Sequence, residues 1–356
     1  MSRGERVRID GLLLLDKPLG ISSNQALQQL KRLYRAAKAG HGGTLDPLAS
    51  GMLPIAFGEA TKFLHALLEA DKCYEASVVL GRSSSTGDAE GVLSDWVDPR
   101  PLVHRLDEVL QTLRTSTQQR PPMHSAIKRE GHALYRLARQ GIEVDRPLRQ
   151  VRIHRLDMID MVECEGLIGT TIRVGLRVCC SKGTYVRSLA EDLGALLGCG
   201  AYLGDLRRTR IGELDAGSMV SIEDLLALDE PRRTRCLFPV DHLLRHLPKV
   251  ELGGEMAERF RLGQRLRLPS SAAPKASAAS AASEATAAPA AYAASEATAA
   301  PAASVAFAES GSPVGMLQVR VYELGSSLLG TATLDPSGRL APQRLVARQA
   351  AQALRV

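Results

Sequence analysis

Residues 40 to 51 read GHGGTLDPLASG, and this stretch decides how the neighbouring chain can fold. Its four glycines and single proline disfavour helix and strand interiors, so we expect a loop between two packed elements. Asp46 is the only residue in it with a full charge at neutral pH, and Pro47 biases Asp46 towards an extended backbone. An ordinary turn with a local Asx hydrogen bond would explain Asp-Pro. The adjacent His41 and glycines that admit another backbone instead favour a functional loop.

The composition is typical of a globular protein with room for two domains. The chain has 356 residues, of which 45% are hydrophobic and 24% are charged. The apolar run Leu12 to Leu15 is too short for a signal peptide, and no run approaches the roughly 18 residues of a membrane span. We therefore expect a cytoplasmic protein without membrane association.

The cysteines and the charge point away from metal binding and towards a polyanion. The six cysteines contain no C-x-x-C pair, which favours reduced, mostly buried thiols, with the adjacent Cys179 and Cys180 on opposite faces of a strand. The net charge is +6, and arginines are clustered, which makes a polyanionic partner plausible. The clusters are Arg149, Arg152 and Arg155; Arg207, Arg208 and Arg210; and Arg259, Arg261, Arg265 and Arg267.

Hydrophobic periodicity predicts a mixture of helices and strands. The predicted strands are 12–15, 73–80, 151–159 and 171–180, and Tyr74 begins the second of them. The predicted helices are 59–69, 102–113, 134–139, 185–197, one from Ser221 through Leu228, and one between a capping box at Ser22 and a C-cap at Gly40. Strands and helices do not alternate strictly, so we expect an α+β fold with a mixed or antiparallel central sheet flanked by helices.

The chain divides into two predicted domains. Residues 1–245 form the larger domain, with an inserted, basic surface element at about 120–150, and the stretch Pro231 to Pro248 is rich in Pro and Arg like an inter-domain boundary. Residues 246–356 form a small β-rich domain with strands at 317–323, 328–334 and 340–346. It is interrupted at 270–308 by an Ala-rich insertion, in which the unit AASEATAAPAA occurs twice, and which we expect to be flexible or marginally helical.

Several chemistries lack their motifs. The sequence has no P-loop and no Rossmann glycine spacing, so a nucleotide cofactor is unsupported. It has no H-E-x-x-H motif or His/Cys cluster for zinc. A glycosidase would need a second carboxylate opposite Asp46, and no residue is clearly nominated for it.

Several co-linear motifs together resemble the bacterial tRNA pseudouridine synthases of the TruB family. They run from about Gly11 to Arg210, and the C-terminal domain is more weakly similar to a PUA RNA-binding module. The motifs are DKPLGISS at 16–23, GHGGTLDPLASG at 40–51, GEATK at 58–62, PP at 121–122 with Ser125, Ala126 and Lys128, SKGTYVR at 181–187 and GCGA at 198–201.

The resemblance implies an enzyme that isomerises uridine to pseudouridine at position 55 in the tRNA T-loop. It implies base flipping, tRNA as partner, and no metal or redox cofactor, and we expect a monomer. Asp46 would be the nucleophile, since a carboxylate is ionised at neutral pH without an activating base. Whether it attacks C1′, attacks C6 or supports a glycal route stays open.

The family's motifs also nominate residues that contact the substrate. Arg187 would pair with Asp46, Tyr74 would lie against the uracil and take part in proton transfer at C5, and His41 would stack where the base has left. The remaining substrate-contact positions are Tyr185, Leu206 and Lys17. For phosphate contacts we expect the basic face at Lys31 to Lys38, the insertion and Arg207-Arg208.

The sequence departs from the family's motif at one position, and two other functions are alternatives to the synthase. The family usually has Thr where this chain has Gly42, which would remove a loop hydrogen bond but leave His41 and Asp46 in place. A non-catalytic RNA-binding or tRNA-folding protein could keep the same fold. A carboxylate-dependent hydrolase of a small glycoside or nucleoside would not need the basic clusters or the C-terminal domain.

Overall fold

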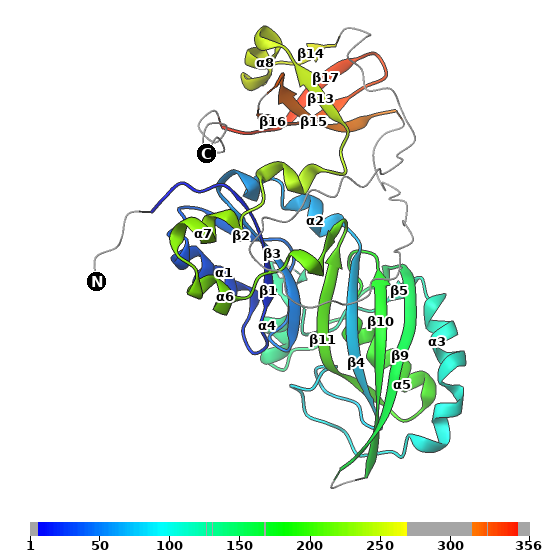
Figure 1. Cartoon of the computed structure of the whole chain (residues 1–356). Coiled ribbons are helices and arrows are strands. Elements are labelled where there is room, and N and C mark those ends of the chain that lie inside the picture. The colour runs from blue at the N-terminus through cyan, green and yellow to red at the C-terminus, as the bar shows by residue number, and fades with distance from the viewer. Residues whose placement is uncertain are drawn as a thin grey trace.

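The computed structural model describes residues 6–125, 127–129, 131–166, 169–268, 315–325 and 327–347. A large twisted sheet with helices on its flanks forms one body, and a smaller sheet with the helix α8 (Gly254–Arg261) forms a second body above it (Figure 1). This confirms the predicted α+β class. The predicted Ala-rich insertion lies outside the described residues.

The predicted strands are present with shifted ends. The strands of the large sheet are β1 (Gly11–Lys17), β2 (Ala39–His41), β3 (Ala49–Phe57), β4 (Lys72–Leu80), β9 (Ile153–Glu165), β10 (Thr170–Cys180), β11 (Ala201–Ile211) and β12 (Leu214–Asp215). The central strands β3 and β11 were not predicted. The α-helices around it are α1 (Ser23–Leu33), α2 (His65–Glu69), α3 (Leu106–Arg114), α4 (Leu134–Arg139), α5 (Val186–Leu197), α6 (Ile222–Ala227) and α7 (Glu230–Arg235). The 3₁₀ helices are η1 (Gly58–Lys62), η2 (Arg100–Arg105), η3 (Ala216–Ser218) and η4 (Val240–Leu244).

The large sheet is mixed. Its order is β1-β3-β11-β4-β10-β9, with β2 paired to β3 and β12 paired to β11. The pairing of β11 with β3 is parallel and joins Leu206–Arg208 to Ala49–Gly51, whereas β11 pairs antiparallel with β4. Strand β11 therefore lies between the end of the 40–51 stretch and the strand that carries Tyr74.

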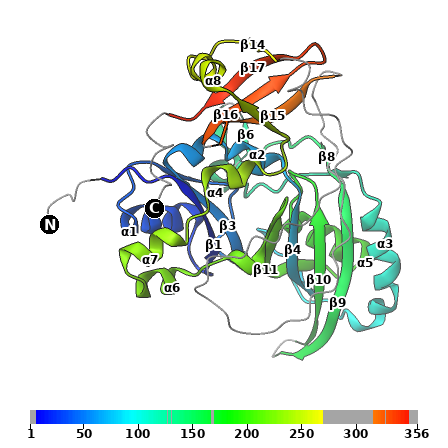
Figure 2. The same cartoon turned by 45° about the horizontal axis from the view of Figure 1, so that its top comes forward.

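Each face of this sheet carries its own hydrophobic core. One face packs against α1, α3, α5 and α6, and Figure 2 shows α3 and α5 together beside β9 and β10. The opposite face packs against η1, α2 and η4. Alternation along the strands explains this division, because Leu13 and Leu15 face the first core while Leu12 and Leu14 face the second.

The 40–51 stretch is less of a loop than its glycines predict, and this part of the prediction is wrong. Its first residues belong to β2 and its last residues to β3, so the loop itself spans 42–48. Gly51 has a φ of +92°, and a Cβ there would lie 2.3 Å from the backbone oxygen of Arg208. That glycine serves the close approach of two strands rather than a turn.

Helix ends account for the other local differences. The capping box at Ser22 is present, but α1 ends at Leu33 rather than near Gly40. Arg35 has a φ of 52°, and Val7 forms hydrogen bonds with Arg35 and Ala37, so the chain leaves the helix to pair with the N-terminal segment. The predicted helix 59–69 is divided into η1 and α2.

The predicted inter-domain boundary at Pro231 to Pro248 is wrong for most of its length. Phe238 and Leu12 exchange two backbone hydrogen bonds, which bring this segment against β1. Leu243, Leu244 and Leu247 are buried in the second core of the large domain. Prolines here begin α7 and η4 instead of opening a linker.

Two of the six cysteines are not reduced, contrary to the prediction. Cys73 on β4 and Cys179 on β10 are directly opposite in the register, and they form a disulfide. The sequence reasoning considered only local spacing, whereas these residues are 106 positions apart and meet through sheet pairing. Cys180, the neighbour, is a buried thiol on the other face, as predicted.

The C-terminal domain is built on a second sheet. Its strands are β13 (Lys249–Leu252), β14 (Leu266–Arg267), β15 (Leu317–Glu323), β16 (Leu328–Leu334) and β17 (Arg339–Leu345), in the order β13-β15-β16-β17-β14. The three predicted strands are thereby confirmed. Phe260 of α8, with 0% exposure, packs into its core.

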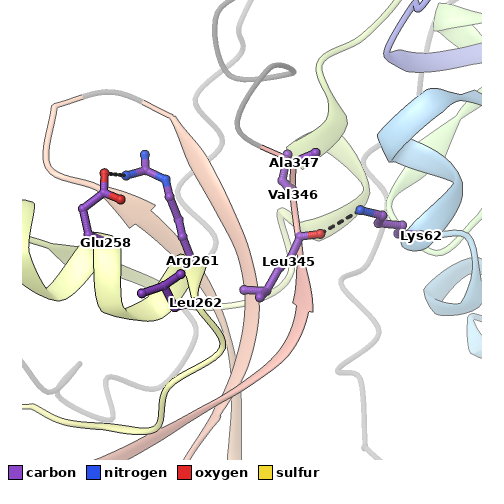
Figure 3. Close-up of a pocket in the computed structure, with 7 residues that line it drawn as sticks. All are labelled: Lys62, Glu258, Arg261, Leu262, Leu345, Val346 and Ala347. Carbon is purple, nitrogen blue, oxygen red and sulfur yellow. Dashed lines mark hydrogen bonds and ion pairs between the residues drawn. The ribbon is translucent and has the colours of Figure 1, made fainter.

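Polar contacts join the two domains. Lys62 Nζ donates to the Leu345 carbonyl at 2.9 Å, as Figure 3 shows, and the Ala347 N–H donates to Glu59 at 2.8 Å. The Tyr322 hydroxyl donates to Asp241 at 2.6 Å. A pocket of about 310 Å³ lies beside the first contact, and it is lined by Lys62, Glu258, Arg261, Leu262, Leu345, Val346 and Ala347.

In the described part of the chain, no helix is long and apolar enough to cross a membrane.

Candidate active site

The loop that carries Asp46 is held by hydrogen bonds from outside it. The buried Ser23, at the start of α1, donates from Oγ to the Leu45 carbonyl at 2.9 Å and accepts from the Leu45 N–H at 2.7 Å. The Pro47 carbonyl accepts from the Gly20 N–H at 2.9 Å. Asp46 is therefore clamped by contacts on both sides of it along the chain.

Asp46 forms the ion pair with Arg187 that the resemblance implies. Arg187 Nη2 lies 2.9 Å from Asp46 Oδ2. The Arg187 side chain is 6% exposed and that of Asp46 is 40% exposed, so the carboxylate opens to solvent while its partner is enclosed. Arg187 follows the N-cap of α5, which places a rigid element behind the guanidinium.

Arg187 also serves a second carboxylate. Its Nη1 lies 3.5 Å from Asp88 Oδ2, and the Asp88 side chain is only 4% exposed. The same guanidinium donates to the carbonyls of His124 at 2.7 Å and Thr86 at 3.3 Å. Its orientation is thus fixed by acceptors from both the 81–91 loop and the base of the 120–150 insertion.

The pKa of Asp46 reflects opposing influences. Burial raises the pKa of this carboxyl, Arg187 lowers it, Asp88 raises it and Lys17 lowers it, and the pKa lies above its ordinary value. For this carboxyl, burial and Asp88 therefore outweigh the cationic neighbours that favour its ionised form. A nucleophile or electrostatic stabiliser benefits from such an environment, because its charge is less screened.

Tyr74 and His41 both lie near Arg208, and Tyr74 is also near Asp46. Tyr74 is 8% exposed, burial raises the pKa of its hydroxyl, and Arg208 opposes that shift with a hydrogen bond to the hydroxyl oxygen. His41, the last residue of β2, is partly exposed. Burial and then Arg208 lower the pKa of its imidazole, so the ring is neutral at pH 7 and suited to stacking.

Tyr185 and Leu206 occupy the rim of the same region. Tyr185 is the N-cap of α5, and its backbone forms two hydrogen bonds with the Gln119 side chain, at 2.7 and 3.0 Å. Leu206, on β11 beside Ala49 and Ala76, is partly buried against the first core and keeps some exposure.

Lys17 differs from the expectation of substrate contact. Its side chain is fully buried, and its Nζ donates to the carbonyls of Pro18 and Ile21, both at 2.7 Å. Burial lowers the pKa of Lys17 to about 8, while Asp46 raises it. In this structure the ammonium braces the 18–21 turn and acts on Asp46 electrostatically, so it offers no surface to a substrate.

Of the pair Arg207-Arg208, expected to contact phosphate, Arg208 is too buried to do so, whereas the Arg207 side chain is 40% exposed. Arg208 is 2% exposed, and Arg207 forms a two-point ion pair with Asp16, at 2.9 and 2.7 Å. The strand explains the difference, because successive side chains point to opposite faces. Among the basic residues expected to meet a polyanion, Arg32 near the end of α1 is exposed, and so are Arg35, Lys38, Arg149, Arg152, Arg155, Arg259, Arg265 and Arg267.

Family models match the chain over most of its length. A model described as "TruB family pseudouridylate synthase (N terminal domain)" matches residues 31–186. A "tRNA pseudouridylate synthase B C-terminal domain" model matches residues 187–245, and a "Pseudouridine synthase II TruB, C-terminal" model matches residues 304–346. The chain belongs to the TruB family.

Curated relatives and solved structures agree with this assignment. The tRNA pseudouridine synthase B of Dechloromonas aromatica is 51% identical over 269 residues, which cover 76% of this chain and 87% of that protein. The protein of the same name from Burkholderia mallei (strain ATCC 23344) is 45% identical over 344 residues, which cover 97% of this chain and 96% of that protein. A chain from a crystal structure of a Cbf5-Nop10-Gar1 complex has the same fold, with a TM-score of 0.60 at 22% identity over 97% of this chain and 87% of that one.

The departure of this TruB chain at Gly42 has a structural counterpart. A Cβ at Gly42 would lie 2.7 Å from Leu67 Cδ1 and 3.2 Å from Leu64 Cδ2. Leu64 and Leu67, at the N-cap and within α2, therefore fill the space that a threonine side chain would need.

Sequence reasoning missed three residues that shape this TruB site: Ser23, Asp88 and Arg208. Asp88 lies in a loop whose polar composition is that of any exposed turn, yet it is 3% exposed. Arg208 was grouped with its neighbours as surface charge. Only the strand register, which places Arg208 directly opposite Tyr74, reveals its position.

Proposed function

We propose that this chain isomerises uridine to pseudouridine at position 55 in the T-loop of tRNA, with Asp46 as the nucleophile. Membership of the TruB family, with relatives named tRNA pseudouridine synthase B, supports the reaction. The observation that carries the assignment of the site is the Asp46–Arg187 ion pair at 2.9 Å, at the positions of the family's motifs.

The reaction breaks one bond to the ribose and makes another. The N1–C1′ bond breaks, the detached uracil rotates, and C5 bonds to C1′; the C5 proton then leaves and N1 gains a proton. Because uridine and pseudouridine are isomers, no net oxidation occurs and no redox cofactor is needed. We propose that the chain acts without a metal and as a monomer.

In this mechanism Asp46 must be ionised and directed. The Arg187 guanidinium favours the anion and fixes the direction of one carboxylate oxygen, while the 40% exposed side chain leaves the other side open to the sugar or the base. Those features serve attack at C1′, attack at C6 and stabilisation of a glycal equally. Arg187 is held in turn by Asp88 and by two backbone carbonyls, so it is pre-organised before RNA binds.

The neighbouring side chains receive the flipped nucleotide. We assign the Tyr74 ring to contact with the uracil and its hydroxyl to proton transfer at C5. We assign His41 to stacking where the base has left, and Tyr185 and Leu206 to the rim of the pocket. Lys17 acts on the substrate only through Asp46 and the 18–21 turn.

The tRNA surface would extend over both domains. Flipping a stacked base costs roughly a few kcal/mol, which phosphate contacts must offset. We propose the exposed cations of α1 and of the 149–155 segment for those contacts, together with the 120–150 insertion, whose His124 carbonyl accepts from Arg187. The division into a catalytic domain at 1–245 and a PUA-like RNA-binding domain at 246–356 belongs to the same proposal.

The test is to map pseudouridine in a tRNA transcript after treatment with the purified chain. We expect modification at position 55 alone. A matched transcript with cytidine at that position should remain unmodified, although it keeps every other uridine. Modification elsewhere in the T-arm, or none at position 55, would contradict the proposed specificity.

A further inference from the structure

Arg208 is a buried cation at the floor of the site, and the proposed mechanism does not use it. It is 2% exposed, lies on β11 and directly faces Tyr74 on β4 in the strand register. Burial lowers the pKa of this guanidinium, and Tyr74 opposes the shift. Within the described part of the chain, no carboxylate forms an ion pair with it, so its charge must be stabilised by neutral acceptors.

Those acceptors come from different elements that meet beneath Asp46. Nε donates to the Met52 carbonyl on β3 at 2.8 Å. Nη1 donates to the Thr44 carbonyl at 3.4 Å and Nη2 to the Gly43 carbonyl at 3.2 Å, both in the 42–48 loop. One planar group thus connects β3, the loop that carries Asp46 and the strand that carries Tyr74.

The direction of the hydrogen bond to Tyr74 follows from the chemistry of the groups. A guanidinium has five N–H donors and no acceptor, so Tyr74 Oη must accept from Arg208. The tyrosine's own hydrogen is then left to donate elsewhere, and Asp46 lies near enough to raise the pKa of that hydroxyl. The contact therefore leaves the hydroxyl hydrogen to point away from Arg208.

We propose that Arg208 is a positioning residue for the isomerisation, which holds the Tyr74 hydroxyl and the Gly43–Thr44 backbone in register with Asp46. This inference rests on the proposed function. A buried arginine could instead contribute only to folding, which would lower stability without a specific link to Tyr74. The two roles are separated by a double-mutant cycle.

The cycle compares Arg208→Lys, Tyr74→Phe and the double variant in single-turnover pseudouridine formation. Arg208→Lys keeps the charge but loses the fork, and we expect it to slow the reaction by about 10- to 100-fold, as for loss of a hydrogen bond to a charged group. tRNA affinity should stay unchanged, because the residue is buried. In the Tyr74→Phe background the same substitution should cost less than about threefold.

Arg210→Lys is the matched control, since Arg210 lies on the same strand and donates to Gly212 at 2.7 Å away from the loop. It should leave the rate unchanged. Equal costs of Arg208→Lys with and without the Tyr74 hydroxyl, or no cost in either, would overturn the proposal. If the chain without substitutions forms pseudouridine, the proposed function stands even when the proposed role of Arg208 fails.

A second measurement does not depend on folding of an Arg208 variant. The arginine Nε–H signals of the parent chain and of Tyr74→Phe are compared by NMR. We expect the Arg208 Nε–H signal to be protected from exchange, because it donates to Met52, and to shift when the phenol oxygen is removed. A signal that is unchanged in Tyr74→Phe would overturn the link between the two residues.

Discussion

Two buried arginines contact either the side chain of Asp46 or the loop that carries it, and their acceptors differ. Arg187, from α5, faces two carboxylates, Asp46 and Asp88. Arg208, from β11, faces three backbone carbonyls and the phenol of Tyr74. A carboxylate that loses its arginine partner can take up a proton and so change its charge. A backbone carbonyl that loses its arginine partner stays neutral. In the proposed mechanism, Arg187 therefore acts on the charge of Asp46, and Arg208 acts on the geometry around it.

The energetic consequences of losing each arginine differ in the same way. Removing one member of a buried ion pair leaves an uncompensated charge, which costs about 3–5 kcal/mol. Asp88, which is 4% exposed, would bear most of that cost if Arg187 were removed. Removing Arg208 instead relieves a desolvated cation and leaves neutral acceptors unpaired.

Between the two arginines, the larger effect is expected from Arg187→Met, which removes the charge and every donor. We expect the single-turnover rate to fall by at least about 100-fold, comparable with the loss of a donor to a reacting anion. Arg187→Lys keeps the charge and should retain more activity. A rate for Arg187→Met within the range of Arg208→Lys would erase the distinction between the two arginines.

A smaller effect is expected from Gly42→Thr, which disturbs the floor of the site without touching Arg187. The added Cβ would lie 2.7 Å from Leu67 Cδ1. We expect a loss of about 1–3 kcal/mol in the free energy of unfolding from overpacking, with a slower reaction because the adjacent Gly43 carbonyl accepts from Arg208. Denaturant unfolding measures the first, and single-turnover kinetics measure the second.

Leu67→Ala provides the rescue for that variant. Added to Gly42→Thr, it should recover part of the lost stability by giving the threonine space. A double variant that is less stable than either single variant would show that the Gly42–Leu67 contact is not the cause.

The smallest expected effect is a shift in the acid limb of the pH–rate profile. The pKa of Asp46 is raised above its ordinary value, and the proposed mechanism requires the ionised form. Activity should therefore rise with pH through that raised pKa, stay on above it and fall as Asp46 is protonated below it.

The neighbours of Asp46 should move that limb in opposite directions. Asp88 raises the pKa of Asp46, so Asp88→Asn should shift the limb to lower pH. Lys17 lowers the pKa, so Lys17→Gln, which keeps a donor for the Pro18 and Ile21 carbonyls, should shift the limb to higher pH. Shifts in the same direction would contradict the electrostatic account.

Local sequence was sufficient for what depends on local physics. Alternating apolar and polar residues predicted the strand that carries Tyr74, and the capping box at Ser22 predicted the start of α1. The glycine-rich stretch predicted the loop that carries Asp46. Prediction from local sequence failed for residues whose contact partners are distant in the chain. The disulfide of Cys73 with Cys179, the burial of Arg208 and the pairing of Asp88 with Arg187 all depend on strand register or loop closure.

The glycines of the 40–51 stretch show the same limit in one place. The number of glycines predicted a loop, yet Gly51 lies in strand β3. A glycine is needed there because the backbone of Arg208 passes too close for a Cβ. Gly42 is explained only by the side chains of α2. Composition indicates that a glycine is required but not which neighbour requires it.

The most direct test of the account is Asp46→Asn, which keeps the shape of the side chain and an acceptor for Arg187 but removes the charge. tRNA binding and pseudouridine formation are measured on the same preparation, beside the parent chain. The account predicts that the tRNA is still bound and that no pseudouridine is formed. Pseudouridine formation by this variant would contradict the role of the Asp46 carboxylate.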